Sequence, residues 1–360
     1  MRILIVSGQE FSETNRGIDT ITKYFIEKKY MVTHLMVGIN SLKKFKKKRR
    51  LNISNFKQIY SKKSIFSYVG IMGKIFPNIF LKMIKKYQEK LVSNIKFKNF
   101  DLIVLETGKP LFIIDKIPLN IPIILRMSDP IEFSFNSNKE YFKKLEREAI
   151  KRANLILIAH QKLFEYYKEY NNIEYWRTGF DEKKIQSNEL LNKAEEELFY
   201  MGNTQIDFEL LENIIKLNPK ISINIVGNHQ YKSKNSHLKI YGYLDSREYI
   251  EYLQKSKCYI MPFNSKEVEK MKMLGMTSKF YVAMQLGKPI LVRRYGEIQK
   301  DNLDLNIFTY DSLEEANEKL KYILKNNFSK NLKINLFLEN LKNENRKKEL
   351  DMILKKYKLV

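Results

Sequence analysis

The chain has 360 residues and is basic, with 65 Lys and Arg against 41 Asp and Glu, a formal net charge of +24. Hydrophobic residues make up 44% and charged residues 29%, a balance that excludes a disordered tail and indicates a globular protein. The single cysteine, Cys258, excludes an intramolecular disulfide and a zinc site built on cysteines, and it fits a reducing cytoplasm. This length is sufficient for two α/β domains with separate cores.

Short apolar runs alternate with helical patterns along the chain. The predicted strands of the first half are 2–7, 31–37, 101–106, 121–126 and 154–159, and those of the second half are 197–202, 221–227, 238–242, 257–263 and 289–293. Helical patterns lie between them, for example at 16–29, 139–151, 206–217, 246–255 and 279–286. Continuous apolar runs are typical of parallel strands covered on both faces, so the alternation predicts a doubly wound α/β architecture.

A polar stretch separates the two sets of strands. Residues 178–197, "TGFDEKKIQSNELLNKAEEE", are charged and contain no apolar run, so we expect them to link two domains. The start, "MRILIVSG", is too short an apolar segment for a signal peptide and is instead predicted to be a buried first strand. The end of the chain, from 330 to 357, is predicted to be helical.

Positive charge is concentrated in the first 100 residues, which contain 22 Lys and Arg against 5 Asp and Glu. The sharpest cluster is "KKFKKKRR" at 43–50, which fits either a solvated loop or a surface for anionic partners. Residues 64–90 mix aromatic and aliphatic side chains with lysines, and Lys74 and Pro77 interrupt them. Such a segment suits a helix in the membrane interface, but the residues alone favour an ordinary amphipathic helix facing a core.

In open α/β sheets, ligands bind beyond the carboxyl ends of the strands. The first set of predicted strands ends in charged residues, and the second set ends in glycines, small polar residues and an aromatic residue. These residues are Glu106, Arg126 and Asp129 in the first set and Gly202, Thr204, Gly227 and Phe263 in the second. The division predicts acid–base chemistry in the first domain and nucleotide contacts in the second.

Asp129 has two interpretations. In "SDP" it fits the N-cap of a helix with Pro130 at the first helical position, and spacing alone favours this role. The functional alternative is a general base, a carboxylate whose pKa is raised toward neutrality by partial desolvation. Glu106 has the same two interpretations, as a strand-end turn residue or as an acid–base group.

The segment "GMTSK" at 275–279 precedes a predicted helix and fits an anion site. A helix N-terminus presents free N–H groups, Thr277 and Ser278 add hydroxyl donors, and Lys279 adds a charge. An ordinary capped helix with a solvated lysine fits equally well. Metal sites are not supported, because the four histidines lack ligand spacing and no Asp-x-Asp or P-loop motif occurs.

An ordered series of motifs resembles a GT-B glycosyltransferase and, more narrowly, the xanthan glucuronosyltransferase (GumK-like) family. The resemblance runs from about residue 3 to about residue 295. Its motifs are "SGQEFSETNRG" with Phe11 and Arg16, "LETG" with Glu106, "LRMSDP" with Arg126 and Asp129, "YWRTGFD", "YMGNTQIDFELL", "INIVG", "IYGYLDSREYIEYLQKSKCYIMPF" and "TSKFYVAMQLGKPILV". Departures occur at Thr204, Leu244, Phe263 and Val282, where the family has other residues.

The resemblance implies an α/β GT-B fold, in which two Rossmann-like doubly wound domains face a central cleft. The expected domains are an acceptor and membrane-facing domain at 1–179, a nucleotide-sugar donor domain at 180–335, and a C-terminal helix at 336–360 that crosses back to the first domain. By resemblance, Asp129 is the catalytic residue, with Glu106 as a second candidate, and Arg16 and Arg126 lie on the acceptor side. The nucleotide-sugar contacts implied are Thr204, Leu244, Phe263, Thr277, Ser278 and Lys279.

The activity implied is an inverting, metal-independent transfer, without any cofactor, from a nucleotide-sugar to a polyprenyl-diphosphate-linked or other polysaccharide acceptor. A UDP-sugar is the expected donor, and glucuronic acid is the sugar that the resemblance suggests, for a bacterial capsule or exopolysaccharide. The expected location is cytoplasmic and peripheral, with the basic first domain on the anionic inner face of the cell membrane. No nucleic acid is expected as a partner.

Three alternatives stay open at this stage. A retaining GT-B transferase would use a carboxylate in the second domain, for which Glu267 and Glu269 are candidates. A nucleotide-sugar epimerase shares the same fold but would need carboxylates on the donor side. A basic nucleic-acid binder is the non-enzymatic alternative, although the basic region contains no known binding module.

Overall fold

The computed structural model describes residues 1–12, 16–38, 52–61, 75–131, 139–185 and 197–360. The chain forms two compact units: Met1–Thr178 together with Arg346–Val360, and Gly179–Asn345. The basic cluster at 43–50, residues 64–74 and most of the expected linker lie outside the described residues. Among the helices that the structure describes, none has the length and hydropathy needed to cross a bilayer.

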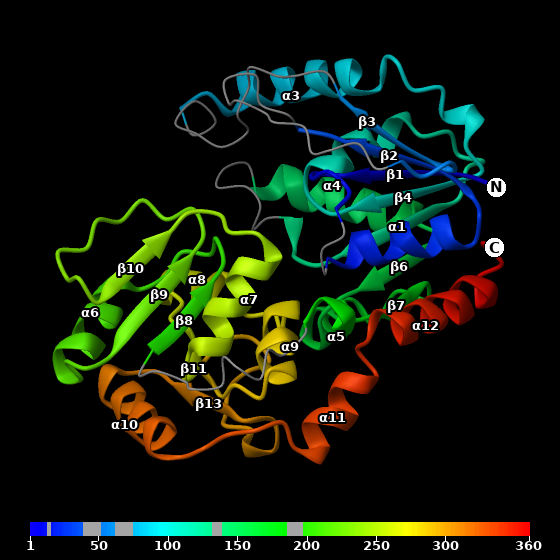
Figure 1. Ribbon diagram of the computed structural model, residues 1–360. Helices are drawn as coiled ribbons and strands as arrows, with labels where there is room; N and C mark the ends of the chain where they lie inside the picture. The colour runs from blue at the N-terminus through cyan, green and yellow to red at the C-terminus, as the bar shows by residue number, and fades with distance from the viewer. Residues whose placement is uncertain (13–15, 39–51, 62–74, 132–138, 186–196) are drawn as a thin grey trace. The chain divides into compact units, whose positions relative to one another are not determined.

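Unit 1 is built on a parallel sheet that, within the described residues, has seven strands in the spatial order β3-β2-β1-β4-β5-β6-β7 (Figure 1). The strands are β1 (Arg2–Ser7), β2 (Met31–Met36), β3 (Phe56–Tyr60), β4 (Leu102–Glu106), β5 (Ile123–Met127), β6 (Leu155–Ile158) and β7 (Ile173–Tyr175). The strand order runs outward in both directions from the β1/β4 pair. In such sheets the ligand crevice lies at the carboxyl ends of these two strands.

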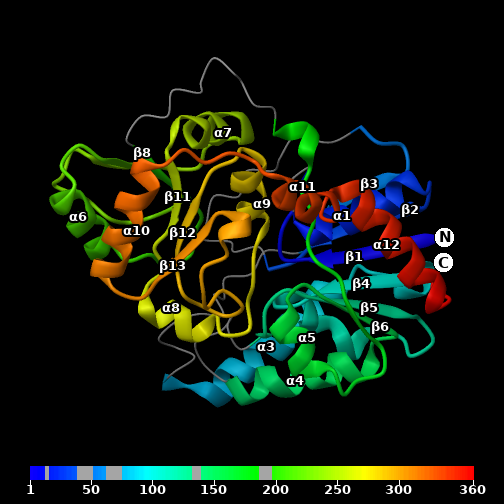
Figure 2. The same ribbon diagram turned by 90° about the horizontal axis from the view of Figure 1, so that it is seen from below.

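Helices cover both faces of the first sheet. They are α1 (Gly17–Glu27), α3 (Pro77–Val92), α4 (Lys139–Arg152), α5 (Gln161–Tyr167) and α12 (Asn343–Lys356), with 3-10 turns η1 (Phe97–Asn99) and η2 (Lys109–Lys116). Figure 2 shows α1 and α12 on one face and α3 and α4 on the other. Side chains of a strand point alternately to its two faces, and here both sets are buried, for example Ile3 and Leu4.

The helix α12 belongs to unit 1 although it follows the whole of unit 2 in sequence. Its buried Leu350 and Leu354 share a core cluster with Ile21 and Phe25 of α1 and with strands β1, β4, β5 and β6. Trp176, at the end of the first chain segment, is buried in the same cluster and donates its indole N–H to the carbonyl of Arg346 at 3.0 Å.

Unit 2 repeats the same architecture with, in the described chain, six parallel strands in the order β10-β9-β8-β11-β12-β13. The strands are β8 (Glu197–Met201), β9 (Ser222–Val226), β10 (Leu238–Tyr241), β11 (Cys258–Met261), β12 (Ile290–Arg293) and β13 (Ile307–Tyr310). The helical elements are η4 (Glu182–Lys184), α6 (Phe208–Leu217), α7 (Ser246–Lys255), α8 (Ser265–Lys270), α9 (Ser278–Gln285), η6 (Leu303–Leu305), α10 (Leu313–Lys325) and α11 (Leu332–Glu339). The order diverges from the β8/β11 pair, which is therefore the second place where a crevice is expected.

The predicted fold class, two Rossmann-like doubly wound domains, is confirmed, and every predicted strand is present within a few residues of its expected ends. Strands β3, β7 and β13 were not predicted. The second boundary between the units lies at Asn345/Arg346 rather than at 336, because α11 packs beside α9 in unit 2. Phe180 and Ile185, inside the expected linker, are buried in the core of unit 2.

Candidate functional site

The carboxyl edge of the first sheet holds a bonded group of polar side chains from three neighbouring strands. Glu106 ends β4, and Arg126 lies directly opposite it on β5. Their side chains form an ion pair with 3.6 Å between Arg126 Nη1 and Glu106 Oε1. Ser7, the last residue of β1, donates its hydroxyl to Glu106 Oε2 at 2.7 Å. Parallel pairing thus brings residues 99 positions apart into one network at the β1/β4 divergence point.

Arg126 is a buried cation inside this network, with a side chain that is 5% exposed. Its Nη2 donates to Thr178 Oγ1 at 3.0 Å, while its Nε has no hydrogen-bond partner among the described residues. Its guanidinium lies against Gly17, where an added Cβ would come within 2.3 Å of Nη2. Burial lowers the pKa of Arg126, and nearby Glu106 and Asp129 oppose that shift. Arg126 therefore supplies a fixed charge to its neighbours.

Asp129 follows β5 by two residues and faces this network. Burial raises the pKa of the Asp129 carboxyl, the charge of Arg126 lowers it, and the charge of Glu106 raises it further. The net direction is upward, so the proton affinity of this carboxyl exceeds that of an ordinary aspartate. The expected N-cap role is weakened by one contact, because the amide of Ile131 donates to Glu146 Oε2 at 2.7 Å instead of to Asp129. Residues 132–138 lie outside the described chain.

Arg16, the other residue expected on the acceptor side, is occupied within its own loop. Its guanidinium binds the buried carboxylate of Asp19 through two nitrogens, at 2.7 and 2.8 Å. It also donates to the carbonyl of Glu10 and the hydroxyl of Ser12. Arg16 therefore ties Glu10 and Ser12, which follow the carboxyl end of β1, to Asp19 of α1.

At the ends of β8 and β9, the carboxyl edge of the second sheet presents glycine backbone rather than charged side chains; farther along this edge, Arg293 at the end of β12 binds Asp207 at 3.1 Å. Gly202 follows β8 and Gly227 follows β9, with φ angles of +155° and +145° that side chains rarely adopt. A Cβ on Gly227 would lie 2.0 Å from the carbonyl oxygen of Gly202. His229, which the sequence analysis did not single out, lies 2.8 Å from that same carbonyl through Nε2. The absence of side chains at these two positions lets the loops pack backbone to backbone.

The start of α9 lies beside Gly202. Lys279 Nζ would be only 2.5 Å from a Cβ placed on Gly202, and it lies 6.0 Å from the ring centre of Tyr200. No carboxylate of the described chain forms an ion pair with Lys279. Burial lowers the pKa of its ammonium group to about 8. The charge is therefore held without an anion to neutralise it.

The other two residues of this segment, Thr277 and Ser278, lie at the N-cap and first position of α9. Thr277 makes no side-chain cap, and its buried Oγ1 has no hydrogen-bond partner among the described residues. The first N–H groups of a helix have no partners within it, so the site combines free donors with a positive dipole end. These features suit a phosphate group.

The remaining expected nucleotide contacts are more dispersed. Thr204 lies in the loop after β8, and that loop pairs with the one after β11 through the bridge between Ile206 and Phe263. Phe263 itself is buried, with its ring edge-on to Tyr295 at 5.0 Å. Leu244 packs on the core beyond the edge strand β10. The structure thus brings Thr277, Ser278 and Lys279 together on one element, while Leu244 lies on a different loop.

The carboxylates considered for a retaining mechanism lie on α8 and are ion-paired. Glu267 binds Lys270 at 2.8 Å and Glu269 binds Lys272 at 2.6 Å. A different acid, Glu297, lies next to Gly275, where a Cβ would come within 2.1 Å of its Oε2. Within the described residues, no cluster of three His, Cys, Asp or Glu side chains could hold a metal ion.

No protein-family profile and no curated protein sequence matches the chain. Solved structures do match over its full length. Sucrose-phosphate synthase from Thermosynechococcus elongatus has a TM-score of 0.69 at 10% identity, covering 99% of this chain and 98% of that one. HepE from Anabaena, in complex with UDP-glucose, has a TM-score of 0.62 at 12% identity, covering 99% and 100%. These likenesses show that the chain has the GT-B fold.

A third match is a trehalose-6-phosphate synthase studied for glycosyl transfer with retention. Its TM-score is 0.64 at 11% identity, and the alignment covers 99% of both chains.

Proposed function

We propose that this protein is a metal-independent, inverting glycosyltransferase that uses a UDP-sugar as donor. The observation that carries the proposal is the placement of two complementary groups on a GT-B fold. In unit 1, Asp129 follows β5 and has a carboxyl with a raised pKa. In unit 2, Lys279 lies in the first turn of α9, beside the carboxyl end of β8, and its ammonium has no ion-pair partner among the described residues. The matched HepE structure binds UDP-glucose, which supports a nucleotide-sugar as the donor here.

On the donor side, the diphosphate would bind at the start of α9. Lys279 would neutralise part of its charge, and the hydroxyls of Thr277 and Ser278 with the free N–H groups of the helix would donate to its oxygens. When the bond between the anomeric carbon and the diphosphate oxygen breaks, its electron pair stays on the diphosphate. The same donors then stabilise the growing negative charge.

On the acceptor side, Asp129 would take the proton of the acceptor hydroxyl while that oxygen attacks the anomeric carbon. A single displacement from the face opposite the diphosphate inverts the configuration of that carbon. A carboxyl with a raised pKa is a stronger base than an ordinary aspartate, and Asp129 has this property. Glu106 is less suited to the role, since its carboxylate already binds Arg126 and Ser7.

The acceptor is proposed to be a polyprenyl-diphosphate-linked oligosaccharide or another polysaccharide, at the cytoplasmic face of the cell membrane. The structure of α3 supports attachment to that surface. Its inner face buries Ile84 and Leu91, while Ile75, Phe76 and Ile79 at its start are exposed, at 58%, 46% and 54%. The outer face carries four exposed lysines, Lys82, Lys85, Lys86 and Lys90. Exposed apolar side chains beside lysines suit an anionic lipid surface.

Two experiments test this proposal. A thermal-shift screen against UDP-, GDP-, ADP- and CMP-sugars should show stabilisation by UDP-sugars, including UDP-glucuronic acid, because a ligand of the folded state raises the melting temperature. Vesicle flotation should show binding to anionic lipids that weakens with salt, and poor binding to neutral lipids. Absence of stabilisation by any nucleotide-sugar would reject the transferase assignment, and equal binding to both vesicle types would reject the electrostatic part.

A retaining transferase is the second candidate, because one of the matched structures is associated with transfer with retention. In a retaining mechanism, Asp129 would not be the base. Glu297, which lies next to Gly275, would then be a candidate for the carboxylate that contacts the donor, together with Glu267 and Glu269. NMR of the anomeric proton in the first-formed product distinguishes the two. Inversion relative to the donor supports the proposal, and retention supports the second candidate.

A further inference from the structure

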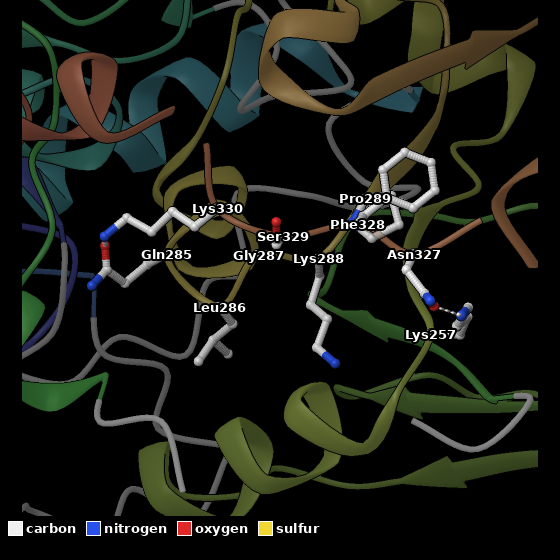
Figure 3. Close-up of a pocket in the computed structure, with 10 residues that line it drawn as sticks. All are labelled: Lys257, Gln285, Leu286, Gly287, Lys288, Pro289, Asn327, Phe328, Ser329 and Lys330. Atoms are coloured by element: carbon white, nitrogen blue, oxygen red, sulfur yellow. Dashed lines mark hydrogen bonds between the residues drawn. The ribbon is translucent and has the colours of Figure 1, made fainter. Parts of the chain in front are cut away.

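Unit 2 contains a cavity of about 450 Å³ at the amino edge of its sheet, away from the loops proposed to bind the donor. Its walls are the residues just before β11 and β12, the end of α9 and the segment after α10. Figure 3 shows Lys330 and Gln285 together at one side, Lys257 and Asn327 at the other, and Lys288 between them.

The polar contacts of these three lysines, within the described chain, are all with neutral oxygens. Lys257 donates to Asn327 Oδ1 at 3.3 Å, and Lys330 donates to Gln285 Oε1 at 2.9 Å. Lys288 donates to the carbonyls of Gln254 and Ser256 at 2.6 and 2.8 Å. Amide and carbonyl oxygens orient an ammonium group but do not cancel its charge.

The cavity lining contains no acidic residue. Outside the lining, Glu182 and Glu339 both bind Lys342 at 2.8 Å. Glu182 also accepts from the amide of Gln285 at 3.3 Å, and the charge of Lys330 acts on Glu339. Burial of the Lys288 side chain, with a smaller contribution from the charge of Lys257, lowers the pKa of Lys288 to about 8. Three cations therefore line one hollow whose own lining holds no carboxylate, and two of them, Lys257 and Lys288, repel each other.

We propose that this cavity binds a small anion of the phosphate type that carries at least two negative charges. Its volume falls in the range of small-molecule sites and is too small for a folded partner or a nucleic-acid duplex. A phosphate oxygen can accept from several ammonium groups at once, and the amide of Asn327 and the hydroxyl of Ser329 offer further donors. The anion would provide the charge compensation that the lining lacks.

This site differs from the proposed donor site, although both lie on α9. Gln285 is the last residue of the helix and Lys279 is its second, so at about 1.5 Å per residue the two ends are about 9 Å apart along the axis. Lys279 lies beside Gly202 at the carboxyl end of β8, whereas Lys257 and Pro289 precede the amino ends of β11 and β12. Because the inference uses none of the donor residues, it stands independently of the proposed function.

Lysine labelling with mass spectrometry gives a test with site-specific readout. The full chain is treated with an amine-reactive reagent, with and without inorganic pyrophosphate, and sodium chloride provides matched ionic strength. We expect pyrophosphate to reduce labelling of Lys257 and Lys330 several-fold. Lys321 and Lys325, exposed on α10, serve as internal controls and should be labelled equally in all samples. The proposal would be overturned if pyrophosphate left the labelling of Lys257 and Lys330 unchanged, or if sodium chloride protected them to the same extent.

Variants give a second, independent measurement. The pair Lys257→Gln and Lys330→Gln removes two charges but retains polar side chains, and Lys288 is kept because it also binds the carbonyls at the end of α7. Calorimetric titration with pyrophosphate is done with saturating UDP, so that any diphosphate site at Lys279 is occupied. The affinity should fall at least tenfold in the double variant and stay unchanged in the matched pair Lys321→Gln and Lys325→Gln. An equal loss of pyrophosphate affinity in both double variants would mean that only the overall charge of the protein matters, and it would contradict a specific site in this cavity.

Discussion

The two sheets follow the same strand order, yet their carboxyl edges differ in character around the central strands. At the first edge, Glu106 and Arg126 are charged side chains that bind each other, and Asp129 lies in their field. At the second edge, glycine backbone packs together, and the ammonium of Lys279 has no ion-pair partner among the described residues. The fold sets where a ligand can bind, and the residues after the strands decide what chemistry occurs there.

The difference between the two carboxyl edges indicates different roles for their charged groups. In a buried network of opposite charges, the charged groups already bind one another, and the network's role is to set the proton affinity of one neighbouring group. A half-buried cation with free N–H donors is incomplete until an anion arrives, so its role is to bind charge. The following predictions separate these roles, from the largest expected effect to the smallest.

The substitution Asp129→Asn should reduce the transfer rate by roughly 10²–10⁴-fold, the usual effect of removing a general base. Asparagine keeps the shape and the capping ability of aspartate but does not accept the proton. Steady-state transfer assays measure the loss, and thermal unfolding and UDP binding should match the wild type. Asp115→Asn, at an exposed position of η2, is the matched control and should leave the rate unchanged.

Comparable turnover by wild type and Asp129→Asn would show that the first edge does not supply the base. A variant that folds, keeps UDP affinity and loses only turnover would place the effect on chemistry rather than on donor binding.

The substitution Lys279→Ala should weaken UDP binding by about 1.5–3 kcal/mol, which is roughly 10- to 150-fold, because a hydrogen bond from a charged group is lost. Isothermal titration calorimetry measures the change. Lys266→Ala is the control, since Lys266 is an exposed lysine in the first turn of α8. Unchanged affinity in Lys279→Ala would make Lys279 a solvated first-turn lysine.

The pH dependence of UDP binding gives a second test of whether the Lys279 ammonium binds the diphosphate. The pKa of Lys279 is lowered to about 8 by burial, so in the free protein the ammonium loses its proton as the pH rises through that value. UDP affinity should therefore be strongest below pH 8 and fall above it, with proton uptake on binding. The Lys279→Ala variant should lack this fall. Affinity that is constant from pH 7 to pH 9 in the wild type would contradict the assignment.

The substitution Gly227→Ala should destabilise unit 2 by about 1–3 kcal/mol, the usual cost of a strained backbone conformation. The φ angle of +145° disfavours a side chain, and the new Cβ would meet the carbonyl oxygen of Gly202 at 2.0 Å. Chemical denaturation measures the free energy of unfolding. Gly242→Ala, with no atom within 4 Å of the added Cβ, should be nearly neutral. Equal stability of both variants would show that close backbone packing is not required at the second edge.

The substitution Glu106→Gln should move the acid limb of the rate profile to lower pH. The charge of Glu106 raises the pKa of Asp129, so its removal lets Asp129 lose its proton at a lower pH. Transfer rates measured between pH 4 and pH 8 test this shift, with Glu89→Gln on the outer face of α3 as control. If the acid limb does not move, the charge of Glu106 does not raise the pKa of the group that controls the rate.

Much of this fold could be predicted from the sequence, because buried parallel strands are continuous apolar runs such as "RILIVS". Two of the three strands that were missed, β3 and β7, lack this signal, whereas β13, "IFTY", is fully buried but only four residues long. β3, "FKQIY", is a half-buried edge strand that contains two polar residues, and β7, "IEY", has only three residues. An edge strand is covered less completely, so selection for apolar residues is weaker there.

The positions of Asp129 and Lys279 were also predictable, Asp129 as a residue that follows a strand and Lys279 as a residue that opens a helix. Their surroundings were not. The bond between Ser7 and Glu106 depends on β1 lying beside β4, and the contact of Lys279 with Gly202 depends on the second sheet. Such neighbours are set by strand order, which no local pattern contains.

The helix α12 also constrains the order in which the protein can mature. Ribosomes make chains from the N-terminus, so residues 179–345 of unit 2 emerge before 346–360. Unit 2 can begin to fold as it emerges, whereas the core of unit 1, begun first, is complete only when Leu350 and Leu354 cover it. Until then, the earlier half of unit 1 presents an apolar face to solvent, and folding chaperones can protect it during that interval.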